Sequence, residues 1–171
     1  MQRKGNLREG ISIKRIIIEP EKCTGCRECE LACSMTKTGE FNPMKALIRA
    51  VYFPEDMLTV PLTCLQCDEP LCQDVCPANA ISRNPETNAV VINSNKCIGC
   101  NMCVSVCPVG AIQKVEGEGV VTKCDLCDGE PACVEFCSTG ALQYEETDEF
   151  NVVRSRDTAS AIKNVLKGVE K

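Results

Sequence analysis

Short apolar runs alternate with polar, turn-forming segments along most of the chain. Such runs, when Pro, Gly, Asn or Asp residues bound them, are typical of short β-strands. The pattern predicts strands at Ile13–Ile18, Ala46–Phe53, Leu58–Thr63, Ala80–Ile81, Val90–Ile92 and Ala141–Tyr144, with a further apolar pair at Ala111–Ile112. These runs are much too short to cross a bilayer. We therefore expect a small fold of short strands with no membrane span.

The segments between the runs indicate how the strands pair. Asn84–Asn88 is a polar turn, which predicts a hairpin between the two strands that flank it. The last strand, Ala141–Tyr144, can pair with Ile16–Ile18, and this would nest the middle of the chain between its ends. Val115–Val121 contains two glycines and predicts a flexible link.

A helix is expected near the C-terminus. Asp157–Thr158 is an N-cap signal, and the apolar residues that follow it recur on one helical face. These residues are Ala161, Ile162, Val165, Leu166 and Val169. Such a face either packs on its own domain or docks on a larger partner, and the sequence leaves both open.

The sixteen cysteines fall into four groups with similar spacing. The groups are Cys23, Cys26, Cys29 and Cys33; Cys64, Cys67, Cys72 and Cys76; Cys97, Cys100, Cys103 and Cys107; and Cys124, Cys127, Cys133 and Cys137. We number them one to four. The second and third read C-x2-C-x4-C-x3-C-P and C-x2-C-x2-C-x3-C-P. Because no cysteine is left over, a ligand framework explains the pattern far better than chance.

The third group has the spacing of bacterial ferredoxins, in which three cysteines hold one iron–sulfur cluster and the fourth holds its neighbour. One group alone therefore cannot complete a site, whereas two groups together can. In the first group, Cys29 and Cys33 are four residues apart, so a helical turn would place them on one side. Such a turn can direct them to different clusters.

Two other uses of many cysteines fit less well. A disulfide-rich secreted protein would need a signal peptide, and residues 1–15 hold no apolar segment of that kind. We expect the protein in the cytoplasm, where disulfides are rare. A structural zinc site usually takes its four ligands as two separated pairs, unlike these closely spaced triplets. The chain has no histidine, which excludes a Rieske centre and histidine-bound haem.

Composition and motifs narrow the range of functions. Only 4% of the residues are aromatic, so the core is small and bound metal would compensate for it. The formal net charge is −5 and there is no basic stripe, which argues against a nucleic-acid partner. We find neither a Walker loop nor a G-x-G-x-x-G fingerprint. No catalytic site of its own is expected.

The four groups together resemble the four-cluster electron-transfer subunits of molybdenum and tungsten oxidoreductases, the DMSO-reductase iron–sulfur subunit type. The resemblance covers about Ile13 to Tyr144. It implies an α+β fold of two intertwined bacterial-ferredoxin-like modules with short β-hairpins, to which this chain adds a C-terminal helix. The short chain is similar to the small subunits that accompany tungsten-containing aldehyde oxidoreductases and the related benzoyl-CoA reductase component.

In that family each cluster takes three cysteines from one group and a last cysteine from another. The resemblance thus implies four 4Fe–4S clusters, held by Cys23, Cys26, Cys29 and Cys137; by Cys64, Cys67, Cys72 and Cys107; by Cys97, Cys100, Cys103 and Cys76; and by Cys124, Cys127, Cys133 and Cys33. The corresponding division is an N-terminal arm at 1–12, a domain at 13–144 and a tail at 145–171. Within the domain we expect an inner module at 64–112, an outer module of 13–33 plus 121–144, and an insertion at 34–63.

The family resemblance implies an electron-transfer subunit. Its clusters would form a wire between a larger catalytic subunit, with a molybdenum or tungsten pterin, and a further electron-accepting subunit or ferredoxin. One alternative is a free polyferredoxin that shuttles electrons between enzymes. A second is a cysteine-rich interaction module that binds zinc.

Three lysines and three aromatic residues near the cysteines are candidates for further roles. Lys22, Lys96 and Lys123 each precede the first cysteine of a group, and a solvated side chain is the simplest interpretation of all three. A role in raising a cluster potential or recognising a partner is the alternative. The aromatic residues of the insertion are expected to shield cluster faces from water. These are Phe41, Tyr52 and Phe53.

Overall fold

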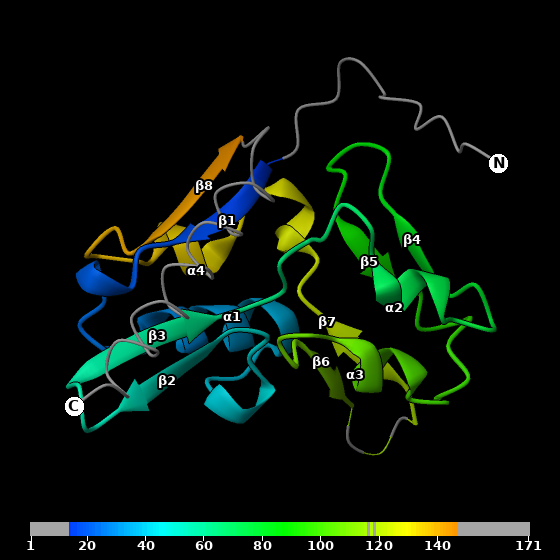
Figure 1. The fold of residues 1–171 in the computed structure, drawn as a ribbon, viewed down its shortest axis with the longest axis horizontal. Helices are drawn as coiled ribbons and strands as arrows, with labels where there is room; N and C mark the ends of the chain where they lie inside the picture. Colours follow the sequence, from blue (N-terminus) through cyan, green and yellow to red (C-terminus); the bar gives the residue numbers. More distant parts are fainter. Residues whose placement is uncertain (1–13, 116, 118, 147–171) are drawn as a thin grey trace, which may run out of the picture. The chain divides into compact units, whose positions relative to one another are not determined.

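The computed structural model describes residues 14–115, 117 and 119–146. Within them, Lys14–Glu145 form one compact unit (Figure 1). The expected N-terminal arm and C-terminal amphipathic helix lie outside the described residues. The described part is a mixed α/β fold with short hairpins, and its helices and strands are all brief.

The strands form two-stranded sheets that link consecutive cysteine groups. The strands are β1 (Lys14–Ile18), β2 (Arg49–Phe53), β3 (Leu58–Leu62), β4 (Ile81–Arg83), β5 (Val90–Ile92), β6 (Ile112–Lys114), β7 (Val121–Lys123) and β8 (Leu142–Glu146). The antiparallel pairs β2–β3, β4–β5 and β6–β7 each join the strand that leaves one group to the strand that leads into the next. Strand β8, after the last group, pairs with β1, before the first (Figure 1). The series of pairs is therefore closed.

Most of the predicted strands are present. The hairpin around Asn84–Asn88 is β4–β5, and the predicted pairing of the first and last strands is confirmed by β1–β8. Strand β2 begins at Arg49 rather than at Ala46. The sequence predicted only a flexible link where β6 and β7 form a hairpin. The predicted link at Val115–Val121 falls on the connection between these strands, and the hairpin itself was not predicted, because β7 has three residues, Val-Thr-Lys, which carry almost no apolar signal.

The helices carry cysteines and are mostly single turns. They are α1 (Glu28–Thr38), α2 (Leu71–Asp74), α3 (Met102–Val106) and α4 (Ala132–Glu135), with 3₁₀ turns η1 (Pro20–Lys22), η2 (Pro43–Lys45) and η3 (Leu126–Gly129). Helix α1 ends where Gly39 adopts a left-handed conformation, and its N–H bonds to the carbonyl oxygen of Met35. Helix α1 contacts α4, and α2 contacts α3. The first group thus lies beside the fourth, and the second beside the third.

The hydrophobic core consists of two clusters, and cysteines belong to both. The first cluster contains Cys29, Cys33, Cys124 and Cys133 with Ile16, Ala46, Leu47, Ile48, Ala89, Leu126 and Leu142. The second contains Cys103 with Ile81, Val90, Ile112 and Val121, and Cys72, Cys76, Cys97 and Cys107 pack against it. The buried cysteines of the first cluster thus come from groups one and four, although Cys64 of group two also packs against it, and the cysteines of the second come from groups two and three.

The aromatic residues of the insertion do not cover the cysteines. Phe41, Tyr52 and Phe53 are 72%, 59% and 43% exposed. Along β2 the burial falls toward the tip of the β2–β3 hairpin, where Tyr52 and Phe53 lie. The expectation that these rings shield clusters from water is wrong, because the tip extends beyond the part of the hairpin that is packed.

Candidate metal centres

The second and third cysteine groups meet around two cavities. Cys64, Cys67, Cys72 and Cys107 line the first, which we call the Cys64 cavity. Cys76, Cys97, Cys100 and Cys103 line the second, which we call the Cys97 cavity. Each cavity therefore has three cysteines of one group and the last cysteine of the other.

The rest of each cavity wall is mainly apolar. Ala78, Ala80, Ile81, Ile92, Ile98 and Val121 line the Cys97 cavity, together with Asn101. Leu65, Pro70, Leu71, Val90, Val106, Pro108, Val109 and Ile112 line the Cys64 cavity, together with Glu69 and Lys123. Apolar walls limit access of water to whatever the thiols bind, and solvent access is one of the factors that set a cluster potential.

Cysteines of the first and fourth groups meet at helices α1 and α4. Cys29 and Cys33 lie on α1 and Cys133 lies on α4, and all three are buried. Burial and the nearby Cys127 both raise the pKa of Cys33, which shows that a cysteine of the fourth group lies close to the last of the first. Cys137 packs against the same hydrophobic cluster as Cys29.

Burial makes several thiols reluctant to ionise. It raises the pKa of Cys29 to about 12, with a contribution from the neighbouring Glu30, and that of Cys124 to about 11. The pKa of Cys133 is raised further by the same cause. Because the thiolate is the form that binds metal, loading these sites must release protons.

Cys137 behaves differently from the buried thiols. Its partial burial would raise its pKa, but hydrogen bonds from the Leu142 N–H and the Thr139 hydroxyl outweigh that effect and lower it. The Thr139 Oγ1 lies 3.7 Å from the Cys137 sulfur. This cysteine therefore forms a thiolate more readily than its buried neighbours.

Backbone N–H groups also point at the last cysteine of each of the other three groups. The Sγ atoms of Cys76 and Cys107 each accept a bond of 3.3 Å from an alanine N–H four residues further on. Cys33 accepts a 3.3 Å bond from the N–H of Leu47, across the insertion. Hydrogen bonds to sulfur stabilise negative charge there, so they favour a thiolate and tune a bound cluster.

A repeated pair of residues explains these bonds. After the last cysteine of each group comes a buried alanine followed by Ile or Leu: Ala46–Leu47, Ala80–Ile81, Ala111–Ile112 and Ala141–Leu142. The alanine is small enough for the backbone to pass close to the sulfur, and the larger residue enters the core. In the first group the insertion lies between the cysteine and this pair.

Lys123 does not lie where the sequence suggested. Its side chain is only 4% exposed and lies in the wall of the Cys64 cavity. Its Nζ donates to the carbonyl oxygens of Val90 and of Cys124, the latter at 2.9 Å. Lys22 and Lys96 are exposed, as expected. The local sequence could not separate the three lysines, since each simply precedes a cysteine.

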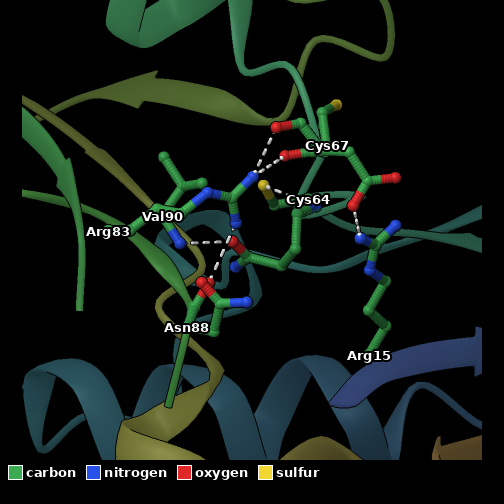
Figure 2. Close-up of polar contacts among 8 residues, drawn as sticks. Arg15, Cys64, Cys67, Arg83, Asn88 and Val90 are labelled. Carbon is green, nitrogen blue, oxygen red and sulfur yellow. Dashed lines mark hydrogen bonds and ion pairs between the residues drawn. The ribbon is translucent and has the colours of Figure 1, made fainter. Parts of the chain in front are cut away.

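Arginines hold the loop that follows Cys64. Figure 2 shows Arg83 donating to the carbonyl oxygens of Cys67 and Asp68, the latter at 2.8 Å, and to that of Asn88 at 3.0 Å. Arg15, which is buried in β1, forms an ion pair with the side chain of Asp68. Neither arginine was expected from the sequence to contact this loop. An arginine within the apolar run of β1 was the available signal.

Gln66 joins this loop to two other elements. Its side chain is buried, its Oε1 accepts from the Val90 N–H at 2.8 Å, and its Nε2 donates to the Cys124 carbonyl oxygen at 2.9 Å. Its own N–H lies 3.5 Å from the Cys64 sulfur. One side chain between two cysteines therefore ties group two to β5 and to the start of group four. Nothing in the sequence marked it.

The thiols that line the two cavities can be compared with the ligands that a metal ion or a cluster requires. Among the described residues, no three His, Cys, Asp or Glu side chains converge as a single metal ion requires. The cysteines are free thiols. A 4Fe–4S cluster is held by four cysteine thiolates, and two of the cavities have four cysteines each in an apolar wall. The donor set therefore fits such a cluster, which supplies one-electron redox chemistry.

These features define a class, the cysteine-ligated iron–sulfur proteins. A family described as "4Fe-4S dicluster domain" matches residues 55–147, and one described as "4Fe-4S binding domain" matches residues 20–36. Since the first match covers more than half of the chain, the protein belongs to the 4Fe-4S dicluster domain family. Its sixteen cysteines are enough for four 4Fe–4S clusters.

Two known proteins resemble this chain over part of their own length. The aliphatic sulfonate oxidoreductase, polyferredoxin-like subunit, of Pyrococcus furiosus is 46% identical over 111 residues, which cover 64% of this chain and 62% of that protein. The B subunit of the anaerobic dimethyl sulfoxide reductase of Escherichia coli is 35% identical over 122 residues, which cover 63% and 58%. The chain thus spans less than two thirds of the length of these relatives. The resemblance to the DMSO-reductase iron–sulfur subunit type is confirmed.

A solved structure covers nearly all of the chain. It is the active site complex BamBC of benzoyl coenzyme A reductase as isolated, with a TM-score of 0.48 and 25% identity. The match covers 94% of this chain and 99% of that one. Separately, no helix among the described residues is long and apolar enough to span a membrane.

Proposed function

We propose that this protein is an electron-transfer subunit of an oxidoreductase complex, with four 4Fe–4S clusters as the wire. The observation that carries the proposal is the pair of cavities, each lined by three cysteines of one group and the last cysteine of the other. Such crossed ligation is how two-cluster ferredoxins place neighbouring clusters. The names of the relatives, which are subunits of a sulfonate oxidoreductase and a sulfoxide reductase, support the wider assignment.

The proposed ligand sets are those that the family resemblance implies. The cavities support the two inner sets, which end in Cys107 and Cys76. The contact between α1 and α4, with Cys127 close to Cys33, supports the outer set that ends in Cys33. Cys137 would complete the set of Cys23, Cys26 and Cys29. The two hydrophobic clusters support an inner and an outer module, which intertwine because β8 returns to β1.

The partner that we propose is a larger catalytic subunit with a molybdenum or tungsten pterin, similar to an aldehyde oxidoreductase. A further subunit or a ferredoxin would take the electrons at the other end. Substrate chemistry would belong to the partner, since the described residues of this chain serve cluster binding. Because the sites need free thiols, we place the protein in a reducing compartment, the cytoplasm.

The proposal is tested by anaerobic purification of the tagged chain from its native host. Iron, sulfide, zinc, molybdenum and tungsten are measured in one fraction. About sixteen irons per chain, four from each cube, together with a large pterin-containing subunit, is the expected result. The same iron content without a partner would instead indicate a free polyferredoxin. Zinc without iron would overturn both.

A further inference from the structure

The two cavities differ in the charge of their walls. Among the described residues that line the Cys97 cavity, none is charged. The Cys64 cavity is lined by the buried Lys123 and by Glu69, which is exposed to solvent. Because solvent and salt screen an exposed charge much more than a buried one, Lys123 dominates the local field at the Cys64 cavity.

The position of the Lys123 ammonium is held by the fold. Nζ donates to the carbonyl oxygens of Val90, in β5, and of Cys124. None of the ion pairs found among the described residues involves Lys123. Among the residues that the structure describes, its hydrogen-bond partners are therefore carbonyl dipoles and not carboxylates.

A second cation binds the loop beside the same cavity. Arg83 donates to the carbonyl oxygens of Cys67 and Asp68, in the loop that carries two of the cavity's cysteines. The carboxylate of Asp68 in that loop is itself paired with Arg15. Besides Lys123 in its wall, the Cys64 cavity therefore has a guanidinium bound to the loop that carries its first two cysteines.

Reduction adds one electron, and hence one negative charge, to an iron–sulfur centre. A fixed positive charge nearby stabilises the reduced form and raises the reduction potential, whereas a neutral wall does not. On the basis of the proposed function, we infer that Lys123 makes the Cys64 cavity the electron-holding site of the inner pair. With clusters bound, one electron would leave the centre held by the cysteines of the Cys97 cavity, which would be oxidised, and enter the centre held by those of the Cys64 cavity, which would be reduced. No bond forms or breaks.

The test compares two lysines with the same sequence context. Lys123→Gln removes the buried charge but keeps a polar side chain, and Lys96→Gln removes an exposed charge that also precedes a first cysteine. Lys123→Arg keeps the charge. Full-length holoprotein is titrated anaerobically with dithionite and redox mediators, and the reduced centres are followed by EPR.

We expect Lys123→Gln to lower the reduction potential of one transition. The ratio of reduced to oxidised centre at a given potential should fall about tenfold, which corresponds to about 59 mV for one electron. Lys123→Arg should restore most of this shift, and Lys96→Gln should leave every transition close to that of the wild type. A shift of equal size in Lys96→Gln, or none in Lys123→Gln, would overturn the inference.

Ligand variants identify the transition. Cys72→Ser alters the centre at the Cys64 cavity, and Cys103→Ser alters that at the Cys97 cavity. The transition moved by Lys123→Gln must be the one that Cys72→Ser alters, and in the wild type it must have the higher potential of the two. The reverse order would refute the inference even if Lys123→Gln failed to assemble.

Failure of the inference is distinguishable from failure of the proposed function. A chain that purifies without iron gives no transitions and contradicts the proposed function itself. A chain with about sixteen irons, whose transitions ignore Lys123, contradicts only the role of the lysine.

Discussion

Gly99, between two cysteines of the third group, is required by both its conformation and its surroundings. Its φ is +68°, and a Cβ there would lie 2.0 Å from the carbonyl oxygen of Gly119. Gly110 has a similar φ of +61°, but a Cβ added at Gly110 would have no atom within 4 Å. The two glycines form a matched pair, because only Gly99 adds a clash to the conformational cost.

We predict that Gly99→Ala destabilises the holoprotein more than Gly110→Ala. In both variants an alanine must adopt a left-handed conformation, which lowers the free energy of unfolding by about 1–2 kcal/mol. Gly99→Ala adds overpacking worth about 1–3 kcal/mol. Thermal loss of visible cluster absorption, measured anaerobically, reports the difference as a lower midpoint. Equal midpoints for the two variants would contradict the close approach to Gly119.

Glu30 is a buried carboxylate with a structural role. Its Oε1 accepts from the Ala50 N–H at 2.9 Å, and its Oε2 lies 3.0 Å from Arg27 Nε. We predict that Glu30→Ala lowers the free energy of unfolding by about 1–3 kcal/mol, because the buried Ala50 N–H loses its acceptor. Glu30→Gln keeps an acceptor and should cost less. Chemical denaturation under anaerobic conditions ranks the variants, and equal losses would show that the hydrogen bond to Ala50 is unimportant.

At the residue scale, the sequence revealed ligands better than their surroundings. The cysteines could be grouped from spacing alone, because three of the four ligands to each proposed centre lie close along the chain. Lys123 and Gln66 could not be found, because their roles depend on burial by β5, which is distant in sequence. Arg15 and Arg83 act on a loop that belongs to neither of their own strands.

Gln66 connects elements that belong to different cysteine groups. We predict that Gln66→Leu leaves the buried Val90 N–H without an acceptor, at a cost of about 1–3 kcal/mol in the free energy of unfolding. The Cys124 carbonyl oxygen loses one of its two donors and keeps the bond from Lys123. Asn79→Leu is the control, since Asn79 is exposed and has the same φ of +48°.

Hydrogen exchange measured by mass spectrometry provides the readout for this pair. The β5 peptide that contains Val90 should exchange faster in Gln66→Leu and remain protected in Asn79→Leu. Unchanged protection of β5 in Gln66→Leu would mean that Gln66 does not couple the second group to the hairpin β4–β5.

At the element scale, the strands that were predicted correctly are those with a clear apolar run or turn in the local sequence. Apolar runs of β1, β5 and β8 were clear, as was the polar turn between β4 and β5. The hairpin β6–β7 was missed because β7 ends in a lysine that is buried through tertiary contacts. The four- and five-residue helices follow from the cysteine loops and have no periodicity of their own to detect.

The crossed ligand sets give a prediction for the whole molecule. We predict that Cys107→Ser alters the same EPR signal as Cys72→Ser, and that Cys76→Ser alters the same signal as Cys103→Ser. The reason is that each cavity is lined by cysteines of both groups. If Cys107→Ser instead altered the signal assigned by Cys103→Ser, each group would hold its own cluster and the crossed sets would be wrong.

At the scale of the whole molecule, the sequence predicted that the first and last strands pair, but it did not predict that the two cavities differ in charge. Pairing of the first and last strands followed from two apolar runs and from the need to join the outer groups. The charge difference between the two cavities did not follow, because it comes from side chains of β4 and β7 and of the loop after Cys67.

The pairing of β8 with β1 means that the cysteine groups have a cyclic order. Every group is preceded and followed by a strand, and each such strand pairs with one from the adjacent group. A circularly permuted chain that begins within the exposed turn at Glu86–Thr87, with a linker from β8 to β1, would keep every strand pair and cut only one connection. Where the polypeptide starts is therefore a property of its gene and not a requirement of its architecture.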